Sequence, residues 1–369
     1  MNTQHSDQEF MSLALALGRR GLGNTWPNPA VGAVIVRPED GAPVIVGRGW
    51  TQPGGRPHAE VEALRLAGAA ARGATMYVTL EPCSHYGKSP PCADAIIAAG
   101  IARVVSAIED PNPEVAGAGH ARLRAAGIAV EVGLCAEEAR RAHAGHIRRM
   151  RDGRPHVTLK LALSADGKAG LAGRRTVAIT GDAVRARVHR LRAMNDAILV
   201  GIGTVLADDP QLTCRLPGME KLSPVRVVLD RQLRLPPASA LATSARQTPV
   251  WVVAGPGVSS DAAQVLARQG VEVLHAPAQA GRLDLAAVLP LLAERGITRL
   301  MVEGGPIVAA AFVAADLVDE AVLFRSPKVI GPDGIDALEG LPLEALTGKL
   351  ALLAREPIGE DGVEFFARA

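Results

Sequence analysis

The feature that most constrains the fold is an alternation of apolar, strand-like runs with amphipathic helical segments. In the first part of the chain the predicted strands are 31–36, 44–46, 75–80, 103–108 and 128–132, and the predicted helices are 7–20, 58–71, 92–99 and 118–126. The first of these helices, for example, places Phe10, Leu13, Ala14 and Leu17 on one face. Helices that alternate with strands predict a mixed or parallel sheet with helices on both faces.

An Arg-rich segment, residues 137–154, interrupts this alternation and ends in Gly-Arg-Pro. We interpret it as a helix that leads into a linker, with a domain boundary near residue 150; a solvated helix inside a single domain is the alternative. The alternation then resumes, with predicted strands 156–163, 196–200, 225–230, 250–253, 271–274, 299–303 and 319–324 and predicted helices 182–193, 261–269, 284–295 and 306–315. A chain of 369 residues also exceeds one typical core. We therefore predict two α/β domains, 1–150 and 151–369.

Composition and charge argue against several classes of function. Hydrophobic residues make up 48% of the chain, charged residues 21% and aromatic residues 3%, and the formal net charge is +2. This weak charge argues against a polyanion-binding surface, and the few aromatic residues argue against base stacking on RNA. No apolar stretch is long enough for a membrane span, and the polar N-terminus is unlike a signal peptide. We expect a cytoplasmic protein that binds neither nucleic acid nor membranes.

Two of the four cysteines lie in one turn-rich loop, LEPCSHYGKSPPC (80–92). Cys83 and Cys92 could form a disulfide, bind a metal or act as reactive thiols, and two buried thiols could also meet there by coincidence. In a reducing cytoplasm, a paired-cysteine loop is more often metal-binding or catalytic than a disulfide. Cys135 and Cys214 lack such neighbours, and we expect both to be isolated free thiols.

A zinc ion held by two thiolates needs further ligands to complete a tetrahedron. His58 begins a predicted helix in PHAEVEAL (57–64), and Cys92 begins another. The positive end of a helix dipole favours the thiolate form of a cysteine. With His58, Cys83 and Cys92 as protein ligands, the fourth position is open for water, which is typical of a catalytic site. Glu60, two residues after His58, could then carry the proton that hydrolysis requires.

Zinc nucleobase deaminases carry the pattern H-x-E followed by P-C-x-x-C. His58-Ala59-Glu60 and Pro82-Cys83 match this pattern, but eight residues separate the two cysteines here. A non-catalytic protein with a structural zinc is the alternative. Glu60 distinguishes the two, because a structural site has no use for a carboxylate beside its metal.

The second half of the chain lacks a complete dinucleotide-binding fingerprint. Gly201 and Gly203 follow a predicted strand, but Leu206 occupies the third glycine position and no long helix follows. The segment VEGGPIVAAAF (302–312) suits a phosphate instead, because it reads as a strand, a Gly-Gly turn and a helix with Pro306 in its first turn. An ordinary strand-to-helix turn is the alternative.

The first half of the chain resembles the deaminase half of the bifunctional riboflavin-biosynthesis deaminase–reductase family. The resemblance lies in PNPAVGAVIV (27–36), PHAEVEAL (57–64), TLEPCSHYGKSPPCADAII (79–97) and DPNPEVAG (110–117). It implies a cytidine-deaminase-like domain, and a long loop between the cysteines is expected in that family. The implied roles are zinc ligand for His58, Cys83 and Cys92, proton shuttle for Glu60, pyrimidine contact for Asn28, and ribose-phosphate contact for His85 and Lys88. A solvated loop lysine is the alternative for Lys88.

The second half resembles the reductase domain of the same family. The resemblance lies in KLALSADGK (160–168), VHRLRAMNDAILVGIGTVLADDPQLTCR (188–215) and VEGGP (302–306). It implies a dihydrofolate-reductase-like α/β domain that binds NADPH. The implied cofactor-binding residues are Ala162, Ala178, Thr204, Asp208, Gly305, Pro306, Ile307, Val308, Ala309, Ala310 and Ala311. The implied substrate-binding residues are Thr176, Arg192, Leu212, Arg215 and Glu303, of which the two arginines are natural partners for a phosphate.

Two positions depart from the family pattern. Ala178 stands where the family often has an aromatic residue before Ile-Thr, which puts a stacking contact to the cofactor in question. SADG (164–167) replaces the usual SLDG, which we interpret as a packing change. The sequence does not reveal a general acid for ring opening, and Lys160, Asp208 and Glu303 are the candidates.

Together these features predict a bifunctional enzyme that uses Zn²⁺ and NADPH on a small-molecule substrate. The resemblance implies that the N-terminal domain removes an amino group from a diaminopyrimidinone ribosyl phosphate by hydrolysis. The C-terminal domain would then reduce the ribosyl group to ribityl. The alternative is a zinc nucleoside or RNA-base deaminase fused to a pterin-type reductase. The family also implies a homo-oligomer.

Overall fold

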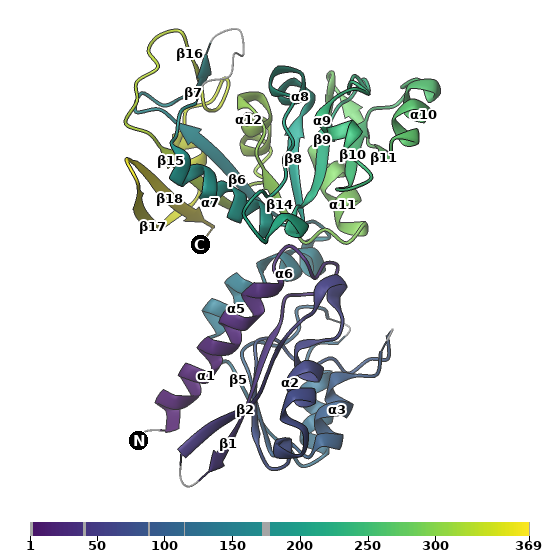
Figure 1. The fold of residues 1–369 in the computed structure, drawn as a ribbon, viewed down its shortest axis with the longest axis vertical. Coiled ribbons are helices and arrows are strands. Elements are labelled where there is room, and N and C mark those ends of the chain that lie inside the picture. Colours follow the sequence, from purple (N-terminus) through teal and green to yellow (C-terminus); the bar gives the residue numbers. More distant parts are fainter. Residues whose placement is uncertain (1–2, 40–41, 88, 114, 172–177, 369) are drawn as a thin grey trace. The chain divides into compact units, whose positions relative to one another are not determined.

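The computed structural model describes residues 3–39, 42–87, 89–113, 115–171 and 178–368. The chain divides into two compact units, Met1–Gly153 and Arg154–Ala369 (Figure 1). Within the described ranges, no helix combines the length and the apolar character that crossing a membrane requires.

In the described part of the N-terminal unit, five strands form one mixed sheet in the order β2-β1-β3-β4-β5. The strands are β1 (Gly32–Glu39), β2 (Ala42–Trp50), β3 (Thr75–Val78), β4 (Arg103–Ser106) and β5 (Ala129–Val132). β1 is antiparallel to both β2 and β3, whereas β3, β4 and β5 are parallel. Ala33, Val34 and Ile35 of β1 are fully buried, as expected for a strand that is covered on both faces.

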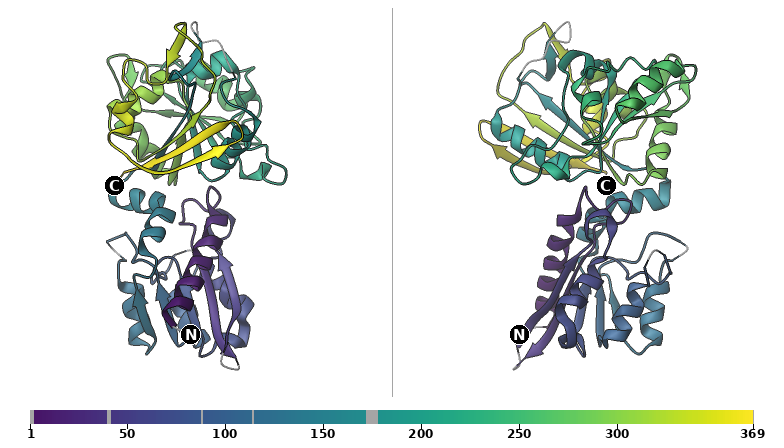
Figure 2. Two further views of the ribbon diagram at one scale, coloured as in Figure 1. Left: turned by 90° about the vertical axis from the view of Figure 1, so that its left-hand side faces the viewer. Right: turned by 45° about the vertical axis from the view of Figure 1, so that its right-hand side comes forward.

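Helices cover both faces of this sheet (Figures 1 and 2). α1 (Thr3–Gly18) and α5 (Ala136–Ala142) lie on one face, and α2 (Ala59–Ala67) and α3 (Cys92–Ala99) lie on the other, with α4 (Ala118–Ala125) beside α3. The start of α2 approaches β2 closely because Gly49 has no side chain: a Cβ there would lie 2.3 Å from the Ala59 carbonyl oxygen. This contact fixes the end of α2 that carries His58 and Glu60.

The Arg-rich segment forms two helices, α5 and α6 (Ala144–Asp152), instead of the single predicted helix. His143 separates them, with φ of −97° and ψ of 13°. Gly153 ends α6 in the left-handed conformation that glycine adopts without strain.

In the described part of the C-terminal unit, nine strands form one sheet in the order β11-β10-β9-β8-β14-β6-β15-β18-β17. These strands are β6 (His156–Leu163), β8 (Ala197–Gly201), β9 (Val225–Leu229), β10 (Val250–Ala254), β11 (Val271–His275), β14 (Arg299–Val302), β15 (Glu320–Arg325), β17 (Ala351–Ile358) and β18 (Asp361–Ala367). Neighbours from β11 to β15 are parallel, and β18 and β17 extend the sheet in antiparallel fashion. Two short pairs stand apart from the sheet: β7 (Lys168–Leu171) with β16 (Gly334–Asp336), and β12 (Ala278–Gln279) with β13 (Arg282–Leu283).

The helices of this unit are α7 (Asp182–Ala193), α8 (Ile202–Asp208), α9 (Ala240–Thr243), α10 (Ser260–Arg268), α11 (Leu285–Glu294), α12 (Pro306–Ala314) and α13 (Glu344–Thr347). α7 buries Val184 and Val188 in a cluster with Met301, Val322 and Phe324 of the sheet. The β17–β18 hairpin is absent from the predicted elements. Most residues of β17 are exposed, so that strand lacks the apolar alternation by which strands are recognised.

Candidate active sites

The predicted zinc ligands converge in the N-terminal unit. His58 immediately precedes α2, Cys92 is the first residue of α3, and Cys83 lies in the loop after β3. One candidate ligand atom from each residue lies within 4.8 Å of the other two. His58 Nδ1 is 3.3 Å from Cys92 Sγ and 3.6 Å from Cys83 Sγ. Sequence segments 25 and 34 residues away from His58 thus meet at one point.

Cys83 and Cys92 shift the pKa values of each other's thiols in opposite directions. Hydrogen bonds from the Cys92 thiol, the His58 ring and the Cys92 backbone N–H lower the pKa of the Cys83 thiol to about 4. The contact with the Cys83 side chain and burial both raise the pKa of the Cys92 thiol. A divalent cation bound to both sulfurs would leave both as thiolates. Two thiolates and an imidazole are donors that zinc prefers, so the residues fit a zinc ion with one open position.

Glu60 lies in the first turn of α2, and only 3% of its surface is exposed. Burial raises the pKa of its carboxyl group, and the nearby His58 opposes this shift. The Cys92 side chain also lies within hydrogen-bonding reach of the carboxyl group. A carboxyl group with a raised pKa beside the candidate ligands is suited to take up and return a proton.

Asn28 lies in the loop before β1 and faces His58. Its Nδ2 donates a hydrogen bond to the Gly55 carbonyl oxygen at 2.8 Å and lies 3.5 Å from His58 Nε2. Gly55 has a φ of 84°, and a Cβ there would lie 2.6 Å from Asn28 Nδ2. The absence of a side chain at residue 55 therefore sets the position of Asn28.

The inter-cysteine loop holds His85, which is exposed, and Lys88, which lies outside the described residues. Asp110, from the loop after β4, lies near His85. Burial alone would raise the pKa of Asp110, but the His146 ring, whose Nε2 lies 3.5 Å from Oδ1, the hydrogen bond from the Asn112 N–H and the nearby His85 hold it below its usual range. The sequence analysis assigned no role to Asp110. The DPNPEVAG segment, which begins with Asp110 and resembles the family, could have pointed to it.

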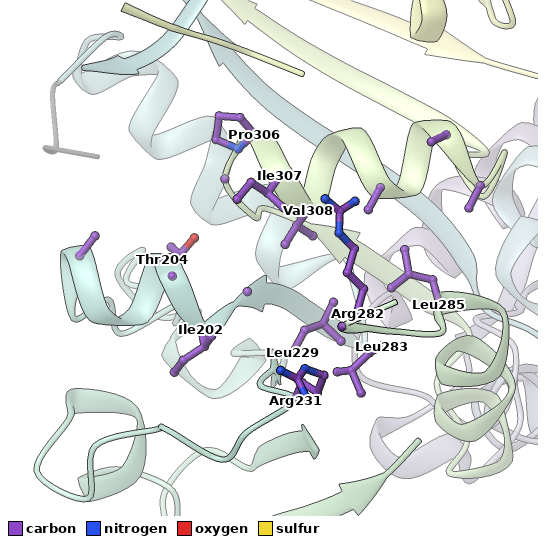
Figure 3. A pocket seen from close by; sticks show the side chains of 18 of the residues that line it. Ile202, Thr204, Leu229, Arg231, Arg282, Leu283, Leu285, Pro306, Ile307 and Val308 are labelled. Carbon is purple, nitrogen blue, oxygen red and sulfur yellow. The ribbon is translucent and has the colours of Figure 1, made fainter. Parts of the chain in front are cut away.

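A cavity of about 990 Å³ lies at the C-terminal ends of β8, β9 and β14 in the second unit (Figure 3). The predicted cofactor residues that line it are Thr204, Asp208, Gly305, Pro306, Ile307, Val308 and Ala311. No side chain in the described residues caps the start of α12. Its first N–H groups are therefore available to a phosphate, as the sequence predicts.

The other predicted cofactor residues do not line this cavity. Ala309 and Ala310 are buried within the domain core, on α12. Ala162 lies on β6, and Ala178 is exposed, with its carbonyl oxygen accepting a hydrogen bond from Lys328 Nζ at 3.1 Å.

Sequence reasoning missed the basic residues of the cavity. Arg231, Arg234 and Arg282 line it, and Figure 3 shows the first and last of these projecting into it. Arg234 lies 3.8 Å from the buried carboxylate of Asp230. Among the described residues, Arg231 and Arg282 have no carboxylate partner. The cavity thus joins a helix N-terminus to two unpaired cations and fits a phosphate-rich dinucleotide.

Two of the predicted substrate residues of the second unit, Arg192 and Glu303, form an ion-pair network with Lys160. Arg192 Nε and Nη2 each donate to the Glu303 carboxylate at 3.0 Å, and Lys160 Nζ lies 3.4 Å from the same group. Burial would raise the pKa of Glu303, but Lys160 and Arg192 hold it below its usual range. Two of the guanidinium nitrogens of Arg192 therefore already bind Glu303, although the sequence predicts that Arg192 binds a phosphate.

Arg215 is exposed, and its described contacts are to neutral groups, Gln211 Oε1 and Thr213 Oγ1. Partial desolvation of the guanidinium and the neighbouring Arg192 lower the pKa of Arg215. With Leu212, both arginines line a second cavity of about 320 Å³. Thr176, the remaining predicted substrate residue, lies outside the described residues.

Comparisons with known proteins find a match for each of the two units. Residues 4–108 match the family model for the cytidine and deoxycytidylate deaminase zinc-binding region, and residues 155–363 match the RibD C-terminal domain. The chain is 43% identical to riboflavin biosynthesis protein RibD of Escherichia coli, over 91% of this chain and 92% of that protein. It is 42% identical to RibD of Aquifex aeolicus, over 98% of each.

Solved structures agree as well. Acinetobacter baumannii RibD (form 1) matches with a TM-score of 0.87 at 37% identity, covering 99% of both chains. A diaminohydroxyphosphoribosylaminopyrimidine deaminase/5-amino-6-(5-phosphoribosylamino)uracil reductase from Thermotoga maritima matches with a TM-score of 0.86 at 35% identity, covering 100% of both. The predicted deaminase-like and reductase α/β folds are therefore confirmed. The chain belongs to the RibD family, the bifunctional zinc-binding deaminases and NADPH-dependent reductases of riboflavin biosynthesis.

Proposed function

We propose that residues 1–150 catalyse the deamination and residues 151–369 catalyse the reduction, on the substrates that the name of the Thermotoga maritima relative states. The convergence of His58, Cys83 and Cys92 beside the buried Glu60 is the observation that carries this proposal. The ligand set supports a zinc site, and the buried carboxyl group supports a hydrolytic role.

In the deaminase, His58, Cys83 and Cys92 would hold a zinc ion, and the bound zinc would supply an activated water. Glu60 accepts a proton from the attacking water and returns it to the departing nitrogen. A carbon–oxygen bond forms, the carbon–nitrogen bond breaks, and ammonia leaves. Asn28 orients the pyrimidine through its amide, and its hydrogen bond to Gly55 supports a fixed orientation. His85 and Lys88 hold the ribose phosphate.

In the reductase, Arg215 is the main phosphate partner, because Glu303 already engages Arg192. Thr176 and Leu212 complete the substrate contacts. Bound NADPH would supply a hydride to the ribosyl C1′, the bond from C1′ to the ring oxygen would break, and that oxygen would take up a proton. Lys160 is the proposed donor of this proton, since its ammonium group is held beside Glu303 in the substrate region.

The start of α12 and Thr204 would hold the phosphates of the cofactor, Asp208 would line the same site, and Ala162 and Ala178 would contact the nicotinamide end. Arg231 and Arg282 bind the 2′-phosphate that distinguishes NADPH from NADH. Both arginines line the same cavity as the start of α12, and an unpaired guanidinium suits a phosphate.

We also propose that the chain acts in the cytoplasm as a homo-oligomer. The family resemblance supports this assembly, and multi-angle light scattering of the purified protein tests it. A monomeric mass at micromolar concentrations would contradict it.

Mass spectrometry of the pyrimidine substrate, incubated with zinc-loaded protein with and without NADPH, tests the function. We expect deamination in both samples and the ribityl product only with NADPH. The Glu60→Gln variant should retain zinc and lose ammonia release while it still reduces the deaminated intermediate. Equal ammonia release from the variant would contradict the role of Glu60, and a loss of both activities would point to a folding defect.

A further inference from the structure

Glu81 is a buried carboxylate that the proposed mechanism does not use. It lies two residues before Cys83, and its side chain is 2% exposed. Oε1 accepts hydrogen bonds from the N–H groups of Gly119 at 2.7 Å and His120 at 3.3 Å. Oε2 accepts from Asp110 at 3.0 Å and Gly117 at 2.9 Å. One side chain therefore gathers four backbone N–H groups from residues 110–120.

No side-chain cation balances this carboxylate among the described residues. The nearest ring is His120, whose Nδ1 lies 3.7 Å from Glu81 Oε2, and burial lowers the pKa of that imidazole. The negative charge is met instead by backbone dipoles, including those at the start of α4. Glu81, Glu109 and His120 are close enough to suggest a second metal site, but each Glu81 oxygen already accepts two hydrogen bonds. The group is better explained as an anchor.

The start of α4 also contacts the residues on either side of Cys83. A Cβ at Gly119 would lie 2.0 Å from the Pro82 carbonyl oxygen, so the two backbones are in direct contact. On the other side, Arg122 Nη1 donates to the Ser84 carbonyl oxygen at 3.2 Å. The residues immediately before and after Cys83 are thus held by the same helix.

Arg122 extends these contacts to the second cysteine. Its Nη2 lies 2.6 Å from Asp94 Oδ1, and Asp94 is in the first turn of α3, two residues after Cys92. A single side chain on α4 therefore contacts both cysteine-bearing segments. The contacts of Glu81 and Arg122 place Asp110 and residues 117–122 against the Cys83 loop and the Cys92 helix together.

We propose that residues 110–113 and 115–122 clamp the two cysteine-bearing segments, with Glu81 and Arg122 as positioning residues that set the spacing of the sulfur ligands. This inference rests on the proposed zinc site. Residues that fix the orientation of metal ligands typically contribute about 10- to 100-fold to metal affinity. The clamp holds Cys83 and Cys92 at the spacing that zinc needs, and it ties the Asp110 loop beside His85 to the same centre.

Zinc affinity of the full-length Glu81→Gln variant, measured by competition with a chromophoric chelator, tests the clamp. A glutamine amide points donor hydrogens at N–H groups that need an acceptor. We expect zinc affinity to fall about tenfold or more. The thiolate-to-metal absorption of the cobalt-substituted variant should change too, because the sulfurs move relative to the metal. The unfolding temperature of the N-terminal unit, measured on the same preparation, is the control for folding.

Asp7→Asn is the matched control within the same unit. Asp7 is a carboxylate that binds Arg103 Nη2 at 2.7 Å and Tyr77 Oη, and it makes no contact with the clamp. Its loss should lower the unfolding temperature and leave zinc affinity unchanged. An equal fall in affinity for both variants would show that Glu81 acts only through stability and would overturn the proposal.

Arg122→Gln provides a milder test if Glu81→Gln does not fold, since the Arg122 side chain is 40% exposed. It should weaken zinc binding in the same direction by a smaller factor, and wild-type affinity would count against the clamp. Cys83→Ser separates this inference from the proposed zinc site. If Cys83→Ser retains wild-type affinity, the site itself is wrong. If it loses zinc while Glu81→Gln and Arg122→Gln bind normally, only the clamp fails.

Discussion

At the scale of single residues, Gly55 controls the geometry around Asn28. Replacing Gly55 by alanine puts a Cβ 2.6 Å from Asn28 Nδ2, in a backbone conformation with φ of 84°. Asn28 must then move away from His58. We expect deaminase kcat/KM to fall roughly 10- to 100-fold, because a displacement of about 1 Å at an active site can cost that much. Ammonia release and NADPH oxidation, measured on one preparation, check this.

Gly54 offers the control. Its φ is 73°, but a Cβ there has nothing within 4 Å. Gly54→Ala therefore carries a similar backbone strain without the contact to Asn28. If both variants lose deaminase activity equally, backbone strain and not the position of Asn28 explains the effect.

The cofactor arginines can be tested by direct binding. Arg231→Ala and Arg282→Ala should each weaken NADPH binding by about 10- to 150-fold, since a hydrogen bond to a charged group contributes about 1.5–3 kcal/mol. NADH binding should change little, because NADH lacks the 2′-phosphate. Fluorescence titration with both cofactors measures the two affinities.

Arg268→Gln is the control for this pair, because Arg268 is exposed on α10 and does not line the cavity. A parallel loss of NADH and NADPH affinity in the Arg231 and Arg282 variants would contradict a specific role in 2′-phosphate binding.

Sequence patterns identify functional residues when those residues belong to a short motif with a characteristic spacing. His58, Glu60, Cys83 and Cys92 belong to such patterns, and the structure brings the three predicted ligands together. Arg231 and Arg282 do not, since they reach one cavity from segments about fifty positions apart. The ion pair between Arg192 and Glu303 is equally hard to predict from the sequence, because it forms only when α7 packs beside β14.

At the scale of elements, prediction succeeds where the whole element is buried or strongly periodic. β6, α3 and α7 have the predicted bounds, 156–163, 92–99 and 182–193. The two short pairs, β7–β16 and β12–β13, were not predicted. Each of these strands has at most four residues, and no hydrophobic period can be recognised over so short a run.

The junction between β6 and β15 depends on one buried carboxylate and should make the C-terminal unit sensitive to acid. Asp319 accepts hydrogen bonds from Arg154 Nη1 at 2.7 Å, Arg154 Nη2 at 2.9 Å and the Val157 N–H at 2.9 Å. Burial would raise the pKa of Asp319, but these partners and the nearby His156 hold it below its usual range. The folded state therefore binds this proton more weakly than the unfolded chain does.

The stabilisation that this difference provides is complete above about pH 4, and it is lost as the pH falls through the lowered pKa of the folded state. Asp319→Asn should destabilise the unit by about 3 kcal/mol at neutral pH, because it removes the buried negative charge to which Arg154 and the Val157 N–H donate. Its free energy of unfolding should then vary less with pH below 4 than that of the wild type. Urea denaturation between pH 3 and 7 measures both effects, and parallel pH profiles would exclude Asp319 as the source.

At the scale of the whole molecule, each unit has a hydrophobic core of its own. One cluster runs from Met11 to Ala139 within the first unit, and the others consist of residues between Val184 and Val363 in the second. The proposed zinc site belongs to the first unit and the cofactor cavity to the second. A ligand that binds only the folded form of one unit stabilises that unit.

We therefore expect two distinguishable thermal transitions with separate ligand responses. Removing zinc with a chelator should lower one transition and abolish deamination, because an absent metal withdraws its binding free energy from folding. NADPH should raise only the other transition, and the chelated protein should still reduce the deaminated intermediate. Differential scanning calorimetry with and without each ligand, paired with both activity assays, checks this. A single transition that zinc and NADPH shift together would mean that the two cores unfold as one cooperative unit. That result would contradict the expected separate responses.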